Sequence, residues 1–387
     1  MHKLTLSIIF IIFSFTCNSQ ETEIIVKNIK GEPIPFASIY NNCGFGTITN
    51  EIGVFTVNKK LIRNDCPKLY ISHLGFKQDS IELKSVKKGM DIYLKNNEIV
   101  LDEIIIGRFD VKKYINSVYK NLQANQSRSF EKSVGYYKQI TKNNNKITEL
   151  LEMINNFEYT NKGIEKWQIK NGRYAVDTTG FLSFKNYSVY TREVYKTYGE
   201  SNIMVSPISE NSKNYDFFNI ELYENGYRKI NFKLRKSIRK KILPLSGSIL
   251  INEKDSSIVK ITGNIKSIVG IKKSHFPYKI RHYLTTYEIV YLENKFYYSQ
   301  INTSFDVYKF FKKKHSINVK SFFVNLKENK TLNTNNETFF TSNSSDIEII
   351  KQIKYNPKLW DNPKIKRIKE EESIIKKFEE KVLFNHK

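Results

Sequence analysis

The sequence has few of the residues that build metal and redox centres. Its 387 residues include only 3 cysteines and 6 histidines. Zinc hydrolases need two or three metal ligands at fixed spacing and a glutamate base. No histidine begins a His-x-x-Glu or His-Glu-x-x-His pattern, and the spacing of His275 and His282 around Pro277 does not fit one helical turn. We therefore expect neither a metal site nor a cofactor.

Motifs of other enzyme classes are missing as well. The sequence has no Gly-x-Ser-x-Gly nucleophile elbow and no phosphate-binding loop that ends in Gly-Lys-Ser or Gly-Lys-Thr. Carboxylates are present, but a hydrolase that works with two carboxylates is recognised by their separation in space. The sequence thus favours a protein without catalytic residues. It leaves open a hydrolase, carboxypeptidase-like or glycosidase, whose site no motif reveals.

Long apolar runs are scarce, and the run from Leu4 to Phe15 is too short to span a bilayer comfortably. It follows a short basic start and precedes small residues, as in a secretory signal peptide. We expect residues 1–19 to be this signal, with cleavage after Ser19. One alternative is an uncleaved anchor. Another is lipidation of Cys17, which the polar residues before that cysteine disfavour.

Acidic residues are outnumbered, since 63 Lys and Arg face 39 Asp and Glu and give a net charge of +24. Such a charge indicates anionic partners, among them membrane headgroups, lipopolysaccharide phosphates and acidic glycans. Because the protein is expected to be exported, nucleic acid is not an expected partner. The alternative is that the abundance of Lys, Asn and Ile throughout the chain reflects base composition.

Two basic runs are the candidate anion-binding sites. The residues are Arg235, Lys236, Arg239, Lys240 and Lys241 in the first run, and Lys312, Lys313 and Lys314 in the second. Clustered cations attract anionic headgroups and phosphates. The alternative is that both runs are solvated strand ends.

Short strand-like segments follow one another from Ile24 to Ile106. They are rich in β-branched and aromatic residues, and Gly, Pro and Asn separate them. Gly31 and Gly53 fall at turns that need a left-handed residue, and residues 46–57 read as a hairpin around the second turn. Pro33 and Pro35 predict a strand that starts late or lies on an edge. Gly75 predicts a bulge. Strands at this spacing can close a small β-sandwich.

The motifs of this stretch resemble a known family. They are Pro33-Ile-Pro-Phe-Ala-Ser-Ile39, Gly46-Thr-Ile-Thr-Asn-Glu-Ile-Gly-Val-Phe55, Ile71-Ser-His-Leu-Gly-Phe76 and a closing Leu101-Asp-Glu-Ile-Ile-Ile106. They are similar to the carboxypeptidase-regulatory-like domain, a transthyretin-like sandwich of envelope proteins in Bacteroidetes-type bacteria. The resemblance implies a fold and a compartment. It implies no chemistry, because that family has no catalytic residues to carry over, and His73 reads as structural.

The expected location of the protein is therefore the periplasm or the periplasmic face of the outer membrane. In an exported protein, Cys43 and Cys66 could form a disulfide within the sandwich or stay as two reduced thiols. The sequence leaves both states open, because it does not show the separation of their Cα atoms.

The rest of the chain predicts a second, larger β domain. Apolar residues at spacings of three and four predict a helix from Asp110 to Asn125, with Asp110 as its cap. Alternating segments then predict hairpins of one antiparallel sheet, including 133–140, 147–159, 227–234, 247–251, 258–261, 283–291 and 296–305. Residues 181–212 read as loops or a short helix. A charged helix is expected from Pro363 to Val382.

Two features of this region resemble known proteins. Gly135-Tyr-Tyr-Lys-Gln139 resembles the usual continuation of regulatory-like-domain proteins, although Lys138 and Gln139 depart from the typical Arg-Glu. The hairpin from Gly247 to Ile261 resembles those of lipoprotein-carrier half-barrels. That second resemblance implies a curved sheet that wraps a helix.

The sequence therefore predicts a mainly β protein with four parts. They are a signal peptide (1–19), a sandwich (20–106), a linker with a helix (107–130), and an antiparallel sheet domain with a C-terminal helix (131–387). The favoured function is a non-catalytic envelope protein that binds an apolar, glycan or protein partner, with an anionic membrane surface as a further partner. A small outer-membrane barrel with a periplasmic sandwich is the alternative, opposed by cations on both faces of 227–236.

Overall fold

The computed structural model describes most of the chain. It covers residues 22–96, 109–124, 131–160, 163–177, 182–195, 206–222, 226–238, 245–266, 278–292, 295–309, 313–325, 345–356, 360 and 369–380, apart from 36, 41–45, 51, 58–66, 74, 75, 78 and 355. Several predictions lie outside these residues: the signal peptide with Cys17, the pair Cys43 and Cys66, Gly75, the closing segment 101–106, and the basic residues Arg239, Lys240, Lys241 and Lys312.

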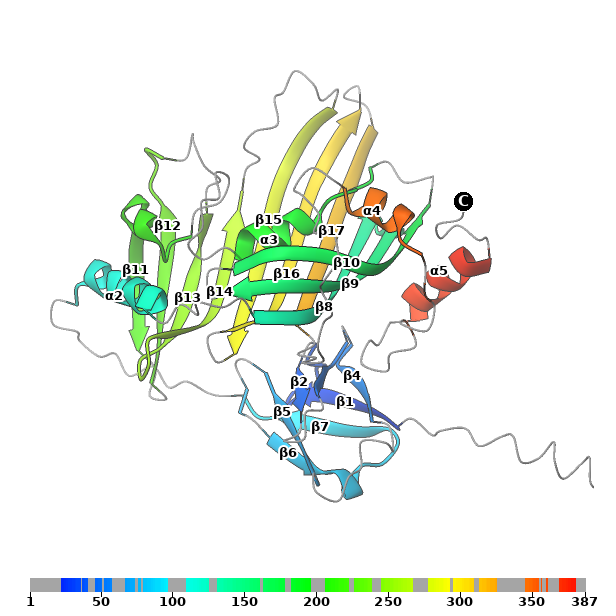
Figure 1. Ribbon diagram of the computed structural model, residues 1–387, viewed down its shortest axis with the longest axis horizontal. Coiled ribbons are helices and arrows are strands. Elements are labelled where there is room, and N and C mark those ends of the chain that lie inside the picture. Colours follow the sequence, from blue (N-terminus) through cyan, green and yellow to red (C-terminus); the bar gives the residue numbers. More distant parts are fainter. Residues whose placement is uncertain are drawn as a thin grey trace, which may run out of the picture. The chain divides into compact units, whose positions relative to one another are not determined.

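The chain is mainly β, with one large antiparallel sheet and a few helices, as the sequence predicts (Figure 1). It divides into two compact units, residues 1–98 with 358–372 and residues 99–357 with 373–387. Within the described ranges, no helix is long and apolar enough to cross a membrane.

The first unit contains two small sheets. Its strands are β1 (Thr22–Asn28), β2 (Ser38–Tyr40), β3 (Gly46–Ile48), β4 (Val54–Val57), β5 (Lys68–Ser72), β6 (Asp79–Glu82) and β7 (Met90–Leu94), with a 3-10 turn η2 (Leu83–Ser85). One sheet has the order β4-β1-β7, with β1 and β7 parallel, and the other has the order β3-β2-β5-β6. Side chains of both sheets share one buried core, which includes Ile24, Phe55 and Ile92 from the first and Ile39 and Ile71 from the second.

The predicted hairpin over residues 46–57 is wrong. β3 pairs with β2, whereas β4 pairs with β1 in the other sheet. The turn at Asn50 therefore carries the chain from one sheet to the other. Thr49, fully buried, fixes this crossing because its Oγ1 accepts from Ala37 N at 2.8 Å and donates to the carbonyl of Ile34 at 2.7 Å.

Two turns of the first unit share one geometry. Asn28 Oδ1 accepts from the backbone N–H groups of Lys30 and Glu32, and Asn50 Oδ1 accepts from those of Ile52 and Val54. Each turn ends at a glycine in the left-handed region, with φ of 83° at Gly31 and 72° at Gly53. These φ values confirm the prediction of a left-handed residue at both positions. Glycine adopts this conformation at little cost in free energy because it has no Cβ. As predicted, the strand after Pro33 starts late, at Ser38.

The second unit is built on a ten-stranded antiparallel sheet. Its strands are β8 (Glu131–Asn143), β9 (Lys146–Thr160), β10 (Gly163–Val176), β11 (Tyr215–Leu222), β12 (Tyr227–Leu234), β13 (Leu245–Asn252), β14 (Ser257–Ile265), β15 (Tyr278–Leu292), β16 (Lys295–Lys309) and β17 (Lys313–Asn325). The order is β10-β9-β8-β17-β16-β15-β14-β13-β12-β11. Two meanders, β8 to β10 and β11 to β17, thus join where β8 pairs with β17.

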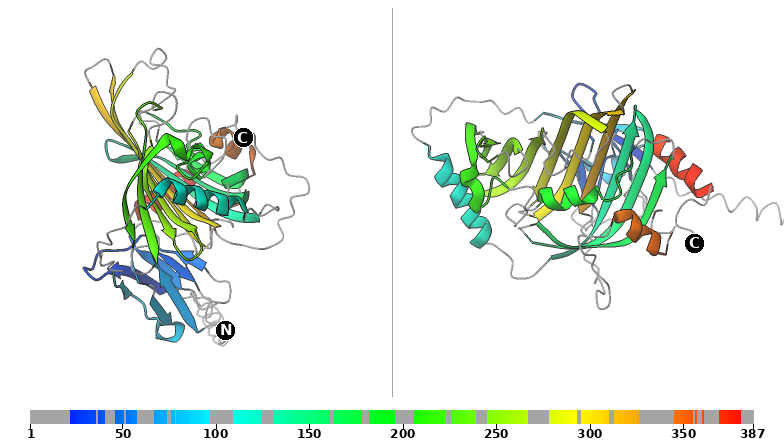
Figure 2. Two further views of the ribbon diagram at one scale, coloured as in Figure 1. Left: turned by 90° about the vertical axis from the view of Figure 1, so that its left-hand side faces the viewer. Right: turned by 90° about the horizontal axis from the view of Figure 1, so that it is seen from above.

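Helices cover the two faces of this sheet. The helices are α2 (Val111–Ala124), α3 (Ser188–Tyr195), α4 (Asp346–Gln352) and α5 (Lys369–Glu380), with a 3-10 turn η3 (Glu210–Asn214) between α3 and β11. We call the face packed against α2, α3 and α4 the inner face, and Figure 2 shows these helices on one side of the curved sheet. On the other face, the outer face, Ile374 and Ile375 of α5 pack on Ile140, Leu150 and Ala175.

Helix α2 forms as predicted. Asp110 Oδ1 accepts from Lys113 N at 3.0 Å, which satisfies one of the free N–H groups at the helix start. Ile115, Val118 and Leu122 form its buried stripe.

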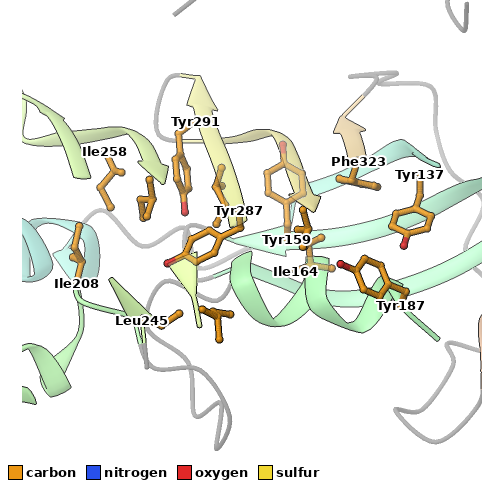
Figure 3. Close-up of a cluster of buried hydrophobic side chains, with 14 of the residues drawn as sticks. Tyr137, Tyr159, Ile164, Tyr187, Ile208, Leu245, Ile258, Tyr287, Tyr291 and Phe323 are labelled. Carbon is orange, nitrogen blue, oxygen red and sulfur yellow. The ribbon is translucent and has the colours of Figure 1, made fainter. Parts of the chain in front are cut away.

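The inner face is filled with aromatic side chains, and glycines of the sheet make room for them. Figure 3 shows part of this core, including Tyr287 and Phe323. A Cβ at Gly135 would lie 2.2 Å from Cζ of Phe323, and a Cβ at Gly263 would lie 2.1 Å from Cζ of Tyr287. A Cβ at Gly172 would lie 2.5 Å from a side-chain carbon of Ile350 in α4. A side chain at any of these three positions would therefore force the group packed on it to shift.

Candidate anion-binding surface

One end of the large sheet is basic. The strand register aligns one residue from each of several strands in a row across the sheet, and the strands continue past this row toward the basic end. The aligned residues include Leu234, Ile265, Thr285, Thr303 and Val319. Among the side chains that the structure describes, the cations beyond this row include Lys142, Lys146, Lys213, Arg235, Lys236, Lys266, Lys279, Arg281 and Lys314. The described acids at this end include Glu149 on the row itself, and Asp177, Asp216 and Asp306, which pair with Lys146, Arg235 and Lys314. Cations are therefore in clear excess.

At the opposite end of the sheet, four described cations pair with three acids. Glu158 pairs with both Lys132 and Lys166 there. Arg228 pairs with Glu253, and Lys229 pairs with Glu221. Among the described side chains, the excess of cations is therefore larger at the first end.

Three strands extend beyond their neighbours at the basic end. Among the described residues, β14 pairs with β15 only from Thr285 onward, and β8 pairs with β17 only from Ile317 onward. Residues 278–284, 304–309 and 313–316 therefore form a three-stranded projection, which we call the tongue. The upper part of Figure 1 shows β15, β16 and β17 reaching past the other strands.

The two faces of the tongue differ in character. Ile280, Tyr283, Phe305 and Val307 belong to the inner-face core or pack against it. The alternation along each strand then places Asp306 and Tyr308 on the outer face, with their register partners Arg281, Lys279, Lys314 and Ser316. Lys279, Arg281 and Lys314 are exposed. The tongue therefore presents a basic outer face on an apolar support.

Asp306 lies at the centre of this outer face and is 9% exposed. Its Oδ2 accepts from Lys314 Nζ at 3.1 Å and lies 2.8 Å from His282 Nδ1. Its Oδ1 accepts from Ser316 Oγ at 2.9 Å. Burial raises the pKa of Asp306, but the hydrogen bonds from His282, Ser316 and Lys314 outweigh it and hold that pKa below its usual range. Asp306 is thus a carboxylate that gathers cations.

The backbone at His282 has an unusual conformation that permits this contact. Its φ is 53°, a left-handed value that is uncommon outside glycine. The register between β15 and β16 shifts over Arg281 to Leu284, so His282 stands in a bulge. Bulges redirect side chains, and this one places the imidazole against Asp306. Beside it, the guanidinium of Arg281 lies 5.3 Å from the ring centre of Tyr308.

The two predicted basic runs lie at the same end of the sheet but do not form one site. Arg235 and Lys236 follow β12, which β13 and β14 separate from β15. Arg235 Nε lies 3.0 Å from Asp216 Oδ1, and Lys236 is exposed. Residues 313 and 314 of the second run both belong to the tongue, at the start of β17. The sequence reading missed Lys279, Arg281 and His282, which the strand register joins to Lys314. Alternation of cations along 279–281 was the available signal.

A second charged group is buried on the outer face and has a structural role. Lys138, Glu152 and Arg173 are neighbours in one register row across β8, β9 and β10, and each is at most 4% exposed. Glu152 accepts from Arg173 Nε and from Tyr136 Oη, both at 2.5 Å. The ammonium of Lys138 lies 4.8 Å from the ring centre of Phe322. Such a buried, paired group fixes the strands and offers no surface to a solute.

Glu149 fixes the loop before α3. This carboxylate is 1% exposed and accepts from Thr141 Oγ1 at 2.6 Å, Ser183 Oγ at 2.7 Å and Tyr174 Oη at 2.9 Å. It also accepts from the backbone N–H of Phe184. A carboxylate engaged by so many donors is an anchor and not a free base.

Asp346 of α4 binds the start of α3. Its Oδ1 accepts from Ser188 Oγ at 2.7 Å and its Oδ2 from Ser188 N at 3.3 Å. Burial raises the pKa of Asp346 to about 6, against the opposing effects of Ser188 and Arg192. Its neighbour Ser345 accepts from Glu348 N, and Glu348 accepts in return from Ser345 N, which forms a capping box for α4.

Metal ligands are not gathered in the part of the chain that the structure describes. No group of three or more His, Cys, Asp or Glu side chains there could hold a metal ion. His282 approaches Asp306, and His73 lies with its ring centre 5.4 Å from that of Phe76.

Comparisons with known proteins do not assign this chain to a family. No family model matches the chain, and no curated protein matches it. A solved structure described as "Asymmetric conductivity of engineered proteins" aligns at 7% identity over 51% of this chain and 99% of that chain. Its TM-score of 0.09 is too low to support any argument. The resemblance to the carboxypeptidase-regulatory-like domain therefore remains an expectation from the sequence.

Proposed function

We propose that this protein is a non-catalytic, exported envelope protein that binds an anionic membrane surface through the outer face of the tongue. The observation that carries the proposal is the gathering of Lys279, Arg281 and Lys314 on one exposed face of a projection. The N-terminal sequence, with its features of a secretory signal, supports a location where such a surface is present. The first unit then serves as an interaction module for an envelope partner.

The shape of the tongue supports a surface and not an enclosed ligand. A projecting three-stranded ribbon with cations on one face can approach a flat layer of headgroups. Each Lys or Arg near an anionic membrane contributes about 1 kcal/mol, so three act together at about 3 kcal/mol, or roughly 100-fold in affinity. Binding of this kind weakens with salt because the charges are exposed and screened.

Vesicle flotation of the purified protein tests the proposal. Vesicles of phosphatidylcholine with and without phosphatidylglycerol are compared at low and high salt. We expect binding only to the anionic vesicles and a loss of binding as salt rises. The triple variant K279E/R281E/K314E is expected to lose roughly 100-fold or more in affinity.

The matched control is K112E/K113E/K254E. It changes the net charge by the same amount at exposed lysines of α2 and of the β13–β14 turn, away from the tongue. We expect its binding to stay within a few-fold of the parent protein. Equal losses in the two triple variants would mean that net charge alone drives binding. No binding of the parent protein to any anionic vesicle would refute the proposal.

A further inference from the structure

Two cations on the outer face of the tongue, Arg281 and Lys314, have side-chain partners. Lys314 is bound to Asp306, and Arg281 lies directly across the strand pair from the same carboxylate. The ring of Tyr308 supports the guanidinium of Arg281 from one side. Cations held by partners lose less freedom on binding than cations on free side chains do. This face therefore combines a general excess of positive charge with cations that specific partners position.

The charge of this face matches a doubly charged anion. Lys279, Arg281 and Lys314 share this face with the carboxylate of Asp306, so its positive charges outnumber the negative one. A phosphomonoester carries about −1.5 to −2 charges near neutral pH, whereas a carboxylate carries one. The guanidinium fork of Arg281 fits two phosphate oxygens, and the ammonium of Lys314 has further N–H donors beyond the one used on Asp306.

Asp306 has a particular role in this arrangement. It accepts from Lys314 and Ser316 and contacts His282, so its oxygens already have partners. It therefore orders the cations around it while it subtracts one charge from their sum. A residue that acts in this way makes the face more selective and less attractive to anions in general.

We infer that the outer face of the tongue binds phosphomonoester headgroups at a membrane surface. Arg281 and Lys314 contact the phosphate, and Asp306 is a positioning residue. This inference rests on the proposed function and narrows the anionic surface to one headgroup chemistry.

Flotation on two kinds of anionic vesicle tests the inference. One contains phosphatidic acid, whose headgroup is a phosphomonoester, and the other contains phosphatidylglycerol at a content that gives the same surface charge. We expect about tenfold tighter binding to phosphatidic acid. Equal binding to both would overturn the inference and leave the proposed function standing. Binding to neither would refute the proposed function.

Two variants separate recognition from charge. Arg281→Lys keeps the charge but removes the fork, so it should lose the preference for phosphatidic acid and keep the binding to phosphatidylglycerol. Asp306→Asn adds one net positive charge, so binding to phosphatidylglycerol should rise while the preference for phosphatidic acid falls. An Asp306→Asn protein whose preference is unchanged would refute the positioning role.

The control for Asp306→Asn is Glu288→Gln. Glu288 lies on β15 where this strand pairs with β16, outside the tongue. Its Oε2 lies 2.8 Å from Lys260 Nζ. This variant makes the same charge change, and its preference for phosphatidic acid should equal that of the parent. A loss of preference in Glu288→Gln as well would assign the effect to net charge and overturn the inference.

Free glycerol phosphate distinguishes a membrane headgroup from a soluble ligand. Added to phosphatidic acid vesicles, it should displace the protein better than chloride of equal ionic strength does. Competition no stronger than that of chloride would overturn the phosphate assignment. Binding of free glycerol phosphate as tight as the binding to vesicles would make a soluble phosphomonoester the ligand and overturn the membrane assignment.

Discussion

The ring of Phe323 on β17 occupies the space that a side chain at Gly135 on β8 would need. A Cβ at position 135 would lie 2.2 Å from Cζ of that ring, and Phe323 itself is fully buried. The ring also contacts Trp167 and Phe157, with centroid distances of 5.0 and 5.1 Å. The two meanders of the sheet thus meet at a glycine and an aromatic ring.

Replacing Gly135 by Ala should destabilise the second unit by about 1–3 kcal/mol, because the fully buried ring packs against Phe157 and Trp167 and must shift. Chemical denaturation measures the change. In a Phe323→Leu background the smaller side chain relieves the clash, so the cost of Gly135→Ala should shrink. An equal cost in both backgrounds would show that the clash with Phe323 is not its cause.

The raised pKa of Asp346 predicts that this group favours folding at low pH. Between the unfolded value, about 3.9, and the folded value, about 6, the native state holds a proton that the unfolded state has lost. Stability from this group therefore rises as the pH falls from 6 toward 4. A shift of about two units corresponds to roughly 3 kcal/mol at most.

The variant Asp346→Asn isolates this contribution, since its other titrating groups are unchanged. Unfolding of both proteins is measured at pH 4.5 and pH 7.5. Relative to the variant, the parent protein should be more stable at pH 4.5 than at pH 7.5. A difference in stability that does not change with pH would contradict the raised pKa.

The docking of α2 depends on a group of three side chains. Tyr114 Oη donates to Glu253 Oε1 at 2.5 Å, and Arg228 Nε lies 2.6 Å from the same oxygen. The guanidinium of Arg228 also lies 4.2 Å from the ring centre of Phe109. Burial raises the pKa of Glu253, but Arg228 and Tyr114 outweigh it and lower that pKa.

Removing the hydroxyl in Tyr114→Phe should cost about 1.5–3 kcal/mol, because the bond is to a charged acceptor. Hydrogen exchange should accelerate in α2 more than in the central strands. Lys112→Ala, on the exposed side of the same helix, is the control and should leave both quantities unchanged within about 0.5 kcal/mol. Uniform acceleration across the sheet in Tyr114→Phe would contradict a local role.

The two turns of the first unit that share one geometry allow a comparison of more buried and more exposed hydrogen bonds. Asn28 and Asn50 each accept from two backbone N–H groups, but Asn50 is 8% exposed and Asn28 lies at a more open turn. Asn50→Ala should cost about 1–3 kcal/mol because the buried N–H of Val54 loses its acceptor, and Asn28→Ala should cost less because water replaces it. Thermal unfolding of both variants checks the order, and equal losses would contradict it.

Local patterns predicted three hairpins of the large sheet, β8–β9, β13–β14 and β15–β16, but they missed β10, β11 and β17 and misassigned one pairing in the first unit. The alternation of residues 227–234 matches β12 to the residue, and the helix stripe matches α2. The prediction of a hairpin over 46–57 was wrong. Asn50 and Gly53 indicate a tight turn, but a tight turn does not determine with which strand the next strand pairs. The seven-residue helix α4 was missed, although Ser345 and Glu348 have the spacing of a capping box.

The candidate site shows the same limit. The run that ends at Lys314 was visible in the sequence, but its partners Lys279 and Arg281 are far from it along the chain. Only the pairing of β15 with β16 and of β16 with β17 brings the three together. Asp306 carried no sequence signal at all, since a lone aspartate in a strand has no motif. Sites built across strands depend on register, which composition does not reveal.

The join between β8 and β17 has a consequence for how the chain folds. The turn residue Asn144 binds Ser316 through two hydrogen bonds, although the two are 172 residues apart in the chain. During synthesis, β8 to β10 emerge first and must keep the unpaired edge of β8 open until β17 arrives. Pairings of such long range form slowly. A chain that is held extended until it is complete, as during export, would avoid the association of these open edges between molecules.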